Sequence, residues 1–212
     1  MSNNHNFIKN SILFSFVFLA LSVTSQEIEE VVVTATKKEE SLQDVAIAID
    51  AFTGEDISEQ LIYDMDDIAE QVPGLGVGKS VGSGSAYTIR GIGSFGVGAA
   101  NTSSVVTASN GHSTNDSVFN DIGMFDLERI EVLKGPQGTL NGRNATTGVI
   151  NFVTARPTAD AGGSVDITVG NYDQQRINSV FNLPLSDSIK SRIAVVSNYR
   201  SGYMKNLELG TT

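Results

Sequence analysis

The chain has 212 residues, a formal net charge of −10 and no cysteine; 40% of its residues are hydrophobic and 18% are charged. The acidic balance argues against a nucleic-acid partner, because phosphate binding needs clustered Lys and Arg side chains and the sequence has no such cluster. The lack of cysteine excludes disulfides, thiolate chemistry and cysteine-based zinc sites, and two histidines, His5 and His112, are too few for a histidine metal site to be expected. The composition therefore predicts one or two domains without a cysteine or histidine metal site, and we expect no cofactor.

Residues 1–25 have the features of a secretory signal peptide. Lys9 supplies the positive charge, residues 12–23 (ILFSFVFLALSV) are apolar, and residues 23–25 (VTS) allow cleavage before Gln26. The apolar run is shorter than the roughly 20 residues that a spanning helix needs, so a removed signal is favoured over an anchor. An exported chain without cysteine fits the envelope of a Gram-negative cell.

Residues 26–44 are predicted to form an exposed, extended arm. A valine-rich run at residues 31–36 (VVVTAT) has high β-propensity, but it is too short and isolated to make a sheet of its own. Such a segment can add itself to the edge of another protein's sheet. The alternative is a first core strand of the following domain, but the charged residues on both sides of the run favour an exposed arm.

Residues 45–93 predict the first half of a small α/β domain. Alternation of apolar and small or polar side chains over residues 45–50 indicates a strand with one buried face. Thr53, followed three residues later by Asp56, is a capping-box pattern and predicts a helix that runs through Leu61.

A second capping pattern begins at Asp64 and predicts another short helix. This helix should end at Val72, because Pro73 disfavours helical geometry in the residue before it and a glycine follows. A glycine-rich pair of strands is expected next, ending at residues 87–91 (YTIRG). Residues 94–124 are polar and lack apolar periodicity. They indicate either a long recognition loop or a disordered tip without a ligand role.

Residues 125–157 have the densest pattern of the chain. Residues 126–129 (DLER) indicate a polar helical turn, and the short apolar run that follows is interrupted by Glu131 and closed by a Gly-Pro turn. A second turn-rich run leads past Gly148 into a β-branched strand at residues 149–154. Charges inside the apolar runs predict a compact domain with a buried ionic network; an ordinary β-hairpin with a long loop is the alternative.

Residues 158–212 predict three antiparallel strands of about 10 residues with alternating polar and apolar side chains, which is typical of a transmembrane barrel. Turns are expected at Asn171 and at residues 184–187, and a soluble meander would have a similar pattern. In the second strand, one face is predicted to carry Ile177, Ser179, Phe181 and Leu183, and the other Arg176, Asn178, Val180 and Asn182.

Residues 126–154 resemble the plug-domain core of TonB-dependent outer-membrane receptors, in which E-V-L-K/R-G-P-x-G-x-L-x-G and G-x-I-N-x-x-T follow one another. Residues 44–57 (DVAIAIDAFTGEDI), 71–75 (QVPGL) and 89–93 (IRGIG) stand in the family's order. There are two departures. Ala46 replaces a frequent proline, and residues 108–112 (ASNGH) lack the aromatic residue and the acid of the family's Y-V-D-G-V-like strand, which puts a strand there in doubt.

This resemblance implies an α+β plug domain, a small mixed sheet with short helices, followed by the first antiparallel strands of a transmembrane β-barrel. The implied divisions are a signal peptide (1–25), a TonB-box arm (26–44), the plug (45–157) and three barrel strands (158–212). Plugged transporters use about 22 strands, so the barrel is incomplete and we expect a truncated product or one piece of a split receptor.

The resemblance also implies a site and partners. The segment expected to bind TonB, hereafter the TonB-binding segment, comprises Glu30, Val31, Val32, Val33, Thr34 and Ala35. The plug core motif comprises Arg90, Gly91, Glu128, Arg129, Glu131, Lys134, Gly135, Pro136, Gly138, Arg143, Gly148 and Asn151, and some of its charges are expected to face the barrel wall.

The implied function is energised uptake of a scarce, bulky substrate across the outer membrane, with the plug gating the barrel. TonB and its inner-membrane complex with ExbB and ExbD would supply the energy. Ferric siderophores, cobalamin and glycans are all carried on this scaffold. The sequence has no nucleophile–base pair, so we do not expect an enzyme. The competing hypothesis is a soluble periplasmic plug module that binds ligand or TonB without a pore.

Overall fold

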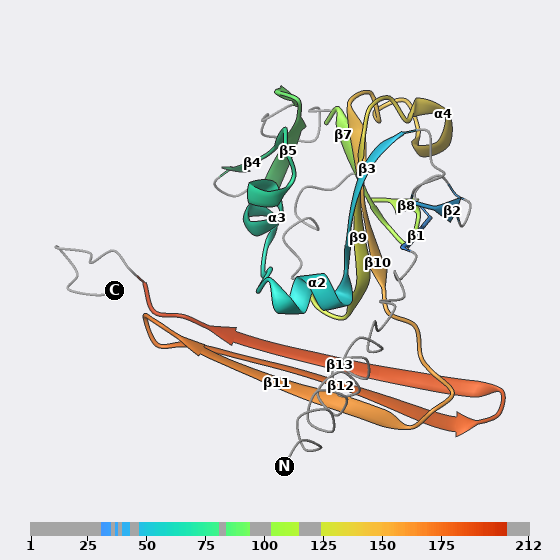
Figure 1. The fold of residues 1–212 in the computed structure, drawn as a ribbon, viewed down its shortest axis with the longest axis vertical. Coiled ribbons are helices and arrows are strands. Elements are labelled where there is room, and N and C mark those ends of the chain that lie inside the picture. Colours follow the sequence, from blue (N-terminus) through green and yellow to red (C-terminus); the bar gives the residue numbers. More distant parts are fainter. Residues whose placement is uncertain are drawn as a thin grey trace, which may run out of the picture. The chain divides into compact units, whose positions relative to one another are not determined.

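The computed structural model describes residues 31–34, 37, 40–42, 47–80, 84–93, 103–114 and 124–202 (Figure 1). The predicted signal peptide lies outside these residues, as do Glu30 and Ala35. A five-stranded sheet has the order β3 (Ala48–Thr53), β9 (Leu127–Lys134), β10 (Gly148–Thr154), β7 (Val105–Ser109) and β8 (His112–Ser113). The smaller sheets are β1 (Val32–Val33) with β2 (Glu40–Ser41); β4 (Leu75–Ser80), β5 (Gly84–Ile89) and β6 (Ile92–Gly93); and β11 (Gly162–Gly170), β12 (Gln174–Ser186) and β13 (Ile189–Tyr199).

Both predicted capping boxes are present and begin the helices α2 (Gly54–Glu59) and α3 (Met65–Gln71). The Thr53 hydroxyl accepts a hydrogen bond from the Asp56 amide at 3.1 Å, while the Asp56 carboxylate accepts from the Thr53 amide at 2.8 Å. Helix α2 ends before Leu61, which was predicted to be helical but has φ +53° and is 55% exposed. Among the described residues, no helix is long and apolar enough to cross a bilayer.

The strand β9 is the centre of the domain, because it pairs antiparallel with β3 on one side and with β10 on the other. The prediction of a helical turn at residues 126–129 is therefore wrong: Asp126 has φ +53° and the chain is extended from Leu127 onward. The reason is tertiary. Arg129 lies between Thr53 and Val153 in the sheet, and pairing on both sides outweighs a weak local helical preference.

Residues 103–114 contain a hairpin that the sequence left in doubt. Its first strand, β7, pairs parallel with β10 and is almost entirely buried. Asn110 and Gly111 have φ +50° and +77°, which suits a tight hairpin turn, and Asn-Gly is the favoured dipeptide for such turns. The turn therefore forms without the aromatic residue and the acid that the sequence analysis found missing.

The two faces of the five-stranded sheet pack against different groups of residues. Ile130 and Val132 belong to the main hydrophobic cluster, which includes residues of α3, β4 and β5. Leu133 belongs to a second, smaller cluster with Val106 and Val149. Alternate residues of a strand point to opposite faces, so Glu131 shares its face with Leu133 and not with the main cluster.

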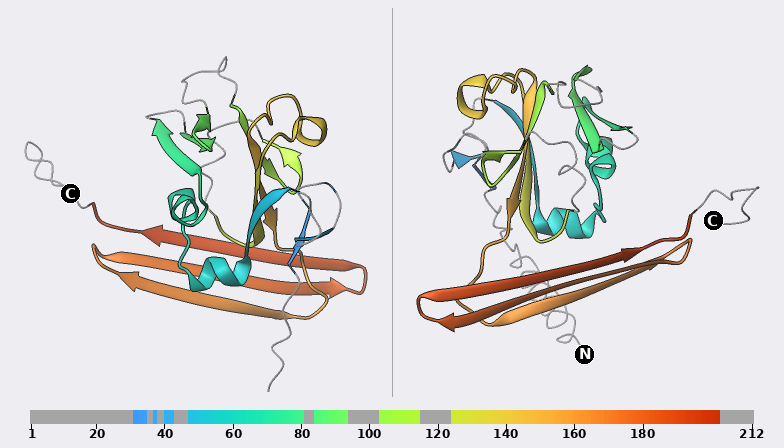
Figure 2. Two further views of the ribbon diagram at one scale, coloured as in Figure 1. Left: turned by 45° about the horizontal axis from the view of Figure 1, so that its top comes forward. Right: turned by 180° about the vertical axis from the view of Figure 1, so that it is seen from behind.

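The strands β11, β12 and β13 form the predicted antiparallel meander and run side by side in both views of Figure 2. Their alternation is confirmed: Ile167 is 68% and Ile193 50% exposed, whereas Val180 is 8% exposed. One turn is placed later than predicted, because β12 continues to Ser186 through an irregularity next to Pro184.

Two arginines connect this meander to the preceding domain. The Arg192 guanidinium on β13 donates through Nε to both carboxylate oxygens of Asp126 at 2.9 Å. The Arg176 guanidinium on β12 lies 4.8 Å from the centre of the Tyr63 ring and donates to the Met124 carbonyl at 3.5 Å. The polar positions of the strands were readable from sequence, but their partners were not.

We expect Gly148→Ala to destabilise the domain. A Cβ at this position would lie 2.3 Å from the Leu133 carbonyl oxygen and 2.5 Å from Ile89 Cδ1, so the sheet would have to shift. Overpacking of this kind costs about 1–3 kcal/mol. The control is Gly138→Ala in α4 (Gly138–Asn141), whose Cβ would meet nothing within 4 Å. Pulse proteolysis in urea should give a lower midpoint for Gly148→Ala alone, and equal midpoints would contradict the packing.

We also expect Asp126→Asn to weaken the connection to β13. Asparagine tolerates the left-handed backbone of Asp126, so the substitution removes the charge without adding strain. The side chains of Arg192 and Asp126 are only 18% and 15% exposed, and loss of the charge should cost about 1–3 kcal/mol. Asp187→Asn, on the exposed turn after β12, is the matched control. Thermal unfolding followed by circular dichroism measures the difference, and an unchanged midpoint for Asp126→Asn would show that the pair contributes nothing.

Candidate functional site

The described part of the TonB-binding segment lies against the domain and is not an exposed arm. Val33 is fully buried, while its neighbour Val32 is 42% exposed. The strand β1 pairs antiparallel with β2, and the Leu42 amide donates to the Val31 carbonyl at 2.9 Å. The prediction of exposure is thus wrong for residues 31–34. Alternate residues of a strand point to opposite sides, so Val33 faces the domain and Val32 faces solvent. The charged residues on both sides of the run therefore do not prevent it from docking.

A buried carboxylate holds the end of this segment. Glu131 Oε1 accepts hydrogen bonds from the Thr34 amide at 2.7 Å and from Arg129 Nε at 2.7 Å. The Thr34 hydroxyl donates to the same oxygen at 3.3 Å and accepts from Arg129 Nη2 at 2.9 Å. Glu131 is fully buried and Arg129 is 8% exposed. The buried ionic network predicted from sequence is therefore confirmed, and residue 34 belongs to it.

The second oxygen of the carboxylate is held by Asn151. These two residues are direct partners in the register of β9 and β10, and Asn151 Nδ2 donates to Glu131 Oε2 at 2.9 Å. Asn151 Oδ1 accepts from the Gly111 amide in the β7–β8 turn at 3.0 Å. We refer to Thr34, Arg129, Glu131 and Asn151 together as the Glu131 site. With these donors the buried negative charge is both paired and hydrogen-bonded, as a charge in the interior has to be.

The remaining residues of the predicted motif have different surroundings. Glu128 forms an ion pair with Arg129 and stays 46% exposed, and Lys134 Nζ lies 2.6 Å from Asp50 Oδ2 on β3. Gly135 and Pro136 form the predicted turn after β9, which leads into α4 with Gly138. Arg90, Gly91 and Arg143 lie on exposed turns.

Sequence reasoning placed some of the motif's charges against the barrel wall. Arg129, Glu131 and Lys134 each have an ionic partner within the domain. The reason is the central position of β9, which brings polar side chains of β3 and β10 within reach of its own. Arg90 and Arg143, by contrast, lie on exposed turns, and which charges face a barrel wall stays a prediction. Asp126 is the residue that does pair with a barrel strand, and the sequence analysis did not single it out.

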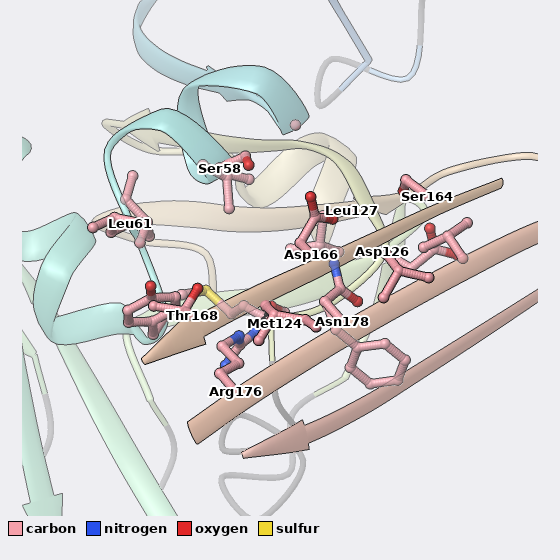
Figure 3. Close-up of a pocket in the computed structure, with 18 of the residues that line it drawn as sticks. Ser58, Leu61, Met124, Asp126, Leu127, Ser164, Asp166, Thr168, Arg176 and Asn178 are labelled. Atoms are coloured by element: carbon pink, nitrogen blue, oxygen red, sulfur yellow. Dashed lines mark hydrogen bonds between the residues drawn. The ribbon is translucent and has the colours of Figure 1, made fainter. Parts of the chain in front are cut away.

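A cavity of about 620 Å³ lies between α2 and the first two barrel strands. Figure 3 shows Ser58 and Leu61 on the side of α2, and Arg176 and Asn178 on β12. Buried oxygens of Asn178 and Tyr63 have no hydrogen-bond partner among the residues that the structure describes, and both residues line the cavity. The lining includes two carboxylates, Asp126 and Asp166, and two guanidinium groups, Arg176 and Arg192, so neither sign of charge predominates.

Several known proteins of much greater length are similar to this chain, and two of them illustrate the match. The Vitamin B12 transporter BtuB of Vibrio vulnificus (strain CMCP6) is 31% identical over 156 residues, which are 71% of this chain and 24% of the relative. An Iron-regulated outer membrane virulence protein of Vibrio cholerae is 28% identical over 198 residues, which are 86% of this chain and 29% of the relative. The chain thus spans about a quarter of the length of these proteins.

Solved structures share the fold. The ferric yersiniabactin uptake receptor FyuA from Yersinia pestis superposes with a TM-score of 0.69 at 24% identity, covering 78% of this chain and 26% of the receptor. A structure of the FpvAI–pyocin S2 complex gives 0.70 at 21% identity, covering 82% and 22%. The predicted fold class, a plug domain followed by antiparallel barrel strands, is confirmed.

The family model described as TonB-dependent Receptor Plug Domain matches residues 41–149, which are more than half of the chain. This confirms the resemblance seen in the sequence motifs. The chain belongs to the TonB-dependent receptor plug-domain family.

Proposed function

We propose that the chain is part of a TonB-dependent receptor of the outer membrane, in which the plug gates energised uptake of a bulky substrate. The observation that carries the proposal is the way residues 31–34 are held. They pair with β2 and contact the Glu131 site, but they are not a strand of the five-stranded sheet. A partner could therefore remove the segment without breaking that sheet.

Residues 31–34 have a second edge, opposite β2, to which a partner could add a strand once Thr34 leaves Glu131. The Val31 carbonyl faces β2, and residues two apart in a strand point to the same edge, so the Val32 and Thr34 amides face the opposite edge. The partner would add a strand there, with main-chain hydrogen bonds supplying affinity and the valines supplying fit. We propose that this partner is TonB. Its inner-membrane complex with ExbB and ExbD would supply the energy for uptake. No bond in the substrate is made or broken in this process.

The barrel strands support a location in the outer membrane over a soluble periplasmic module. Ile167, Val169 and Ile193 present half or more of their surface on the outer face of the meander. In water such a face favours association, whereas in a barrel it meets lipid. Because similar proteins are named for iron-regulated expression and for ferric yersiniabactin, we propose a ferric siderophore as the substrate class.

We expect Val32→Pro to abolish binding of the TonB C-terminal domain to the receptor in outer-membrane fractions. Proline removes the Val32 amide from the edge that the partner would use, while the opposite edge keeps its pairing with β2. Val32 is partly exposed, so the core is left intact. Val32→Ala keeps the amide and is the matched control. Pull-down measures both variants, and undiminished capture of Val32→Pro would refute the proposed contact.

A further inference from the structure

Residues 31–34 of the TonB-binding segment have hydrogen-bond partners on both edges in this structure. On one edge β2 pairs with Val32 and Val33, and on the other the Thr34 amide donates to Glu131 Oε1 at 2.7 Å. A strand added to the second edge would need that same Thr34 amide. Binding of the segment to the plug and binding to a partner are therefore competing states. The strength of the Thr34–Glu131 contact sets the balance between them.

The Glu131 carboxylate can release Thr34 without becoming an unpaired charge. After Thr34 leaves, Oε1 still accepts from Arg129 Nε and Oε2 still accepts from Asn151 Nδ2. An ion pair that keeps its remaining donors avoids most of the cost of an isolated buried charge. The contact is therefore reversible, and its strength depends on how the carboxylate is oriented.

Asn151 fixes that orientation. Its Oδ1 accepts from the Gly111 amide at 3.0 Å, so its Nδ2 must face Glu131; the reversed amide would place oxygen against oxygen. Gly111 is itself held, because the preceding Asn110 exchanges side-chain hydrogen bonds with Thr154: the Thr154 amide donates to Asn110 Oδ1 at 3.0 Å, and Asn110 Nδ2 donates to Thr154 Oγ1 at 3.1 Å.

We propose that Asn151 is a positioning residue for the TonB-binding segment. Acting through Glu131, it determines how readily Thr34 leaves the plug, and it makes that release depend on the position of the β7–β8 turn. The inference rests on the proposed function for its partner, TonB. Its structural part, retention of the segment, can be measured without that partner.

The test exchanges the carboxylate of Glu131 and the amide of Asn151 between the two positions. In Glu131→Gln the new amide must place its NH₂ against Asn151 Nδ2 or against the Thr34 amide, so one donor–acceptor pair is lost. We expect amide hydrogen exchange of residues 31–34, in the receptor in detergent, to accelerate about tenfold, the factor that matches loss of one charge-assisted hydrogen bond. In Glu131→Gln with Asn151→Asp, the glutamine NH₂ can donate to Asp Oδ. Exchange should then return to within about threefold of the parent protein.

The matched control is Glu131→Gln with Asn144→Asp, which has the same composition but places the new carboxylate in the turn after α4. In this variant, amide hydrogen exchange of residues 31–34 should be as fast as in Glu131→Gln alone. The positioning role would be overturned by any one of three results. Exchange could be unchanged in Glu131→Gln, or it could stay fast when Asn151→Asp is added. Residues 127–134 could also accelerate as much as residues 31–34. Binding of the TonB C-terminal domain is measured in parallel, and affinity should rise as exchange accelerates. If exchange follows the expected pattern but no variant binds TonB, the retention role stands and the proposed function fails.

Discussion

Burial of the Glu131 carboxylate is the constraint that brings three segments of this domain together. A charge in the interior is stable only when its oxygens are paired and hydrogen-bonded. Here the donors come from Thr34, from Arg129 on the same strand and from Asn151 on the next. Three chain segments that are distant in sequence must therefore meet at one point, and the docking of residues 31–34 follows from that requirement.

Glu131 holds residues 31–34 on one face of the sheet, and the main hydrophobic cluster packs on the other face. The main hydrophobic cluster draws its buried members from residues between Ile62 and Ile150, on the face of the sheet opposite Glu131. The contact that holds Thr34 thus lies across the sheet from the packing that holds the fold. Loss of the Thr34 contact would therefore leave the hydrophobic core in place.

The barrel strands follow a different physical rule. Ile167, Val169 and Ile193 lie exposed on one face of the meander, and Arg176, Asn178 and Arg192 lie on the other face. Arg192 pairs with Asp126, and Arg176 contacts the Tyr63 ring and the Met124 carbonyl, so two arginines connect the meander to the plug. The alternating pattern of the meander is therefore visible in the sequence, whereas its contacts with the plug are visible only in the structure.

Local chemistry was sufficient to predict several elements from sequence. The two capping boxes, the helix stop at Val72 and the alternation of the barrel strands depend on residues within a few positions of each other. Only tertiary structure decided the features that depend on distant partners. Residues 126–129 are extended because β3 and β10 flank them, and residues 31–34 are docked because the Thr34 amide bonds to a carboxylate 97 positions away. The sequence pattern indicates that a charge will be buried. Strand order and register determine its partners, because they bring together residues that are distant in sequence.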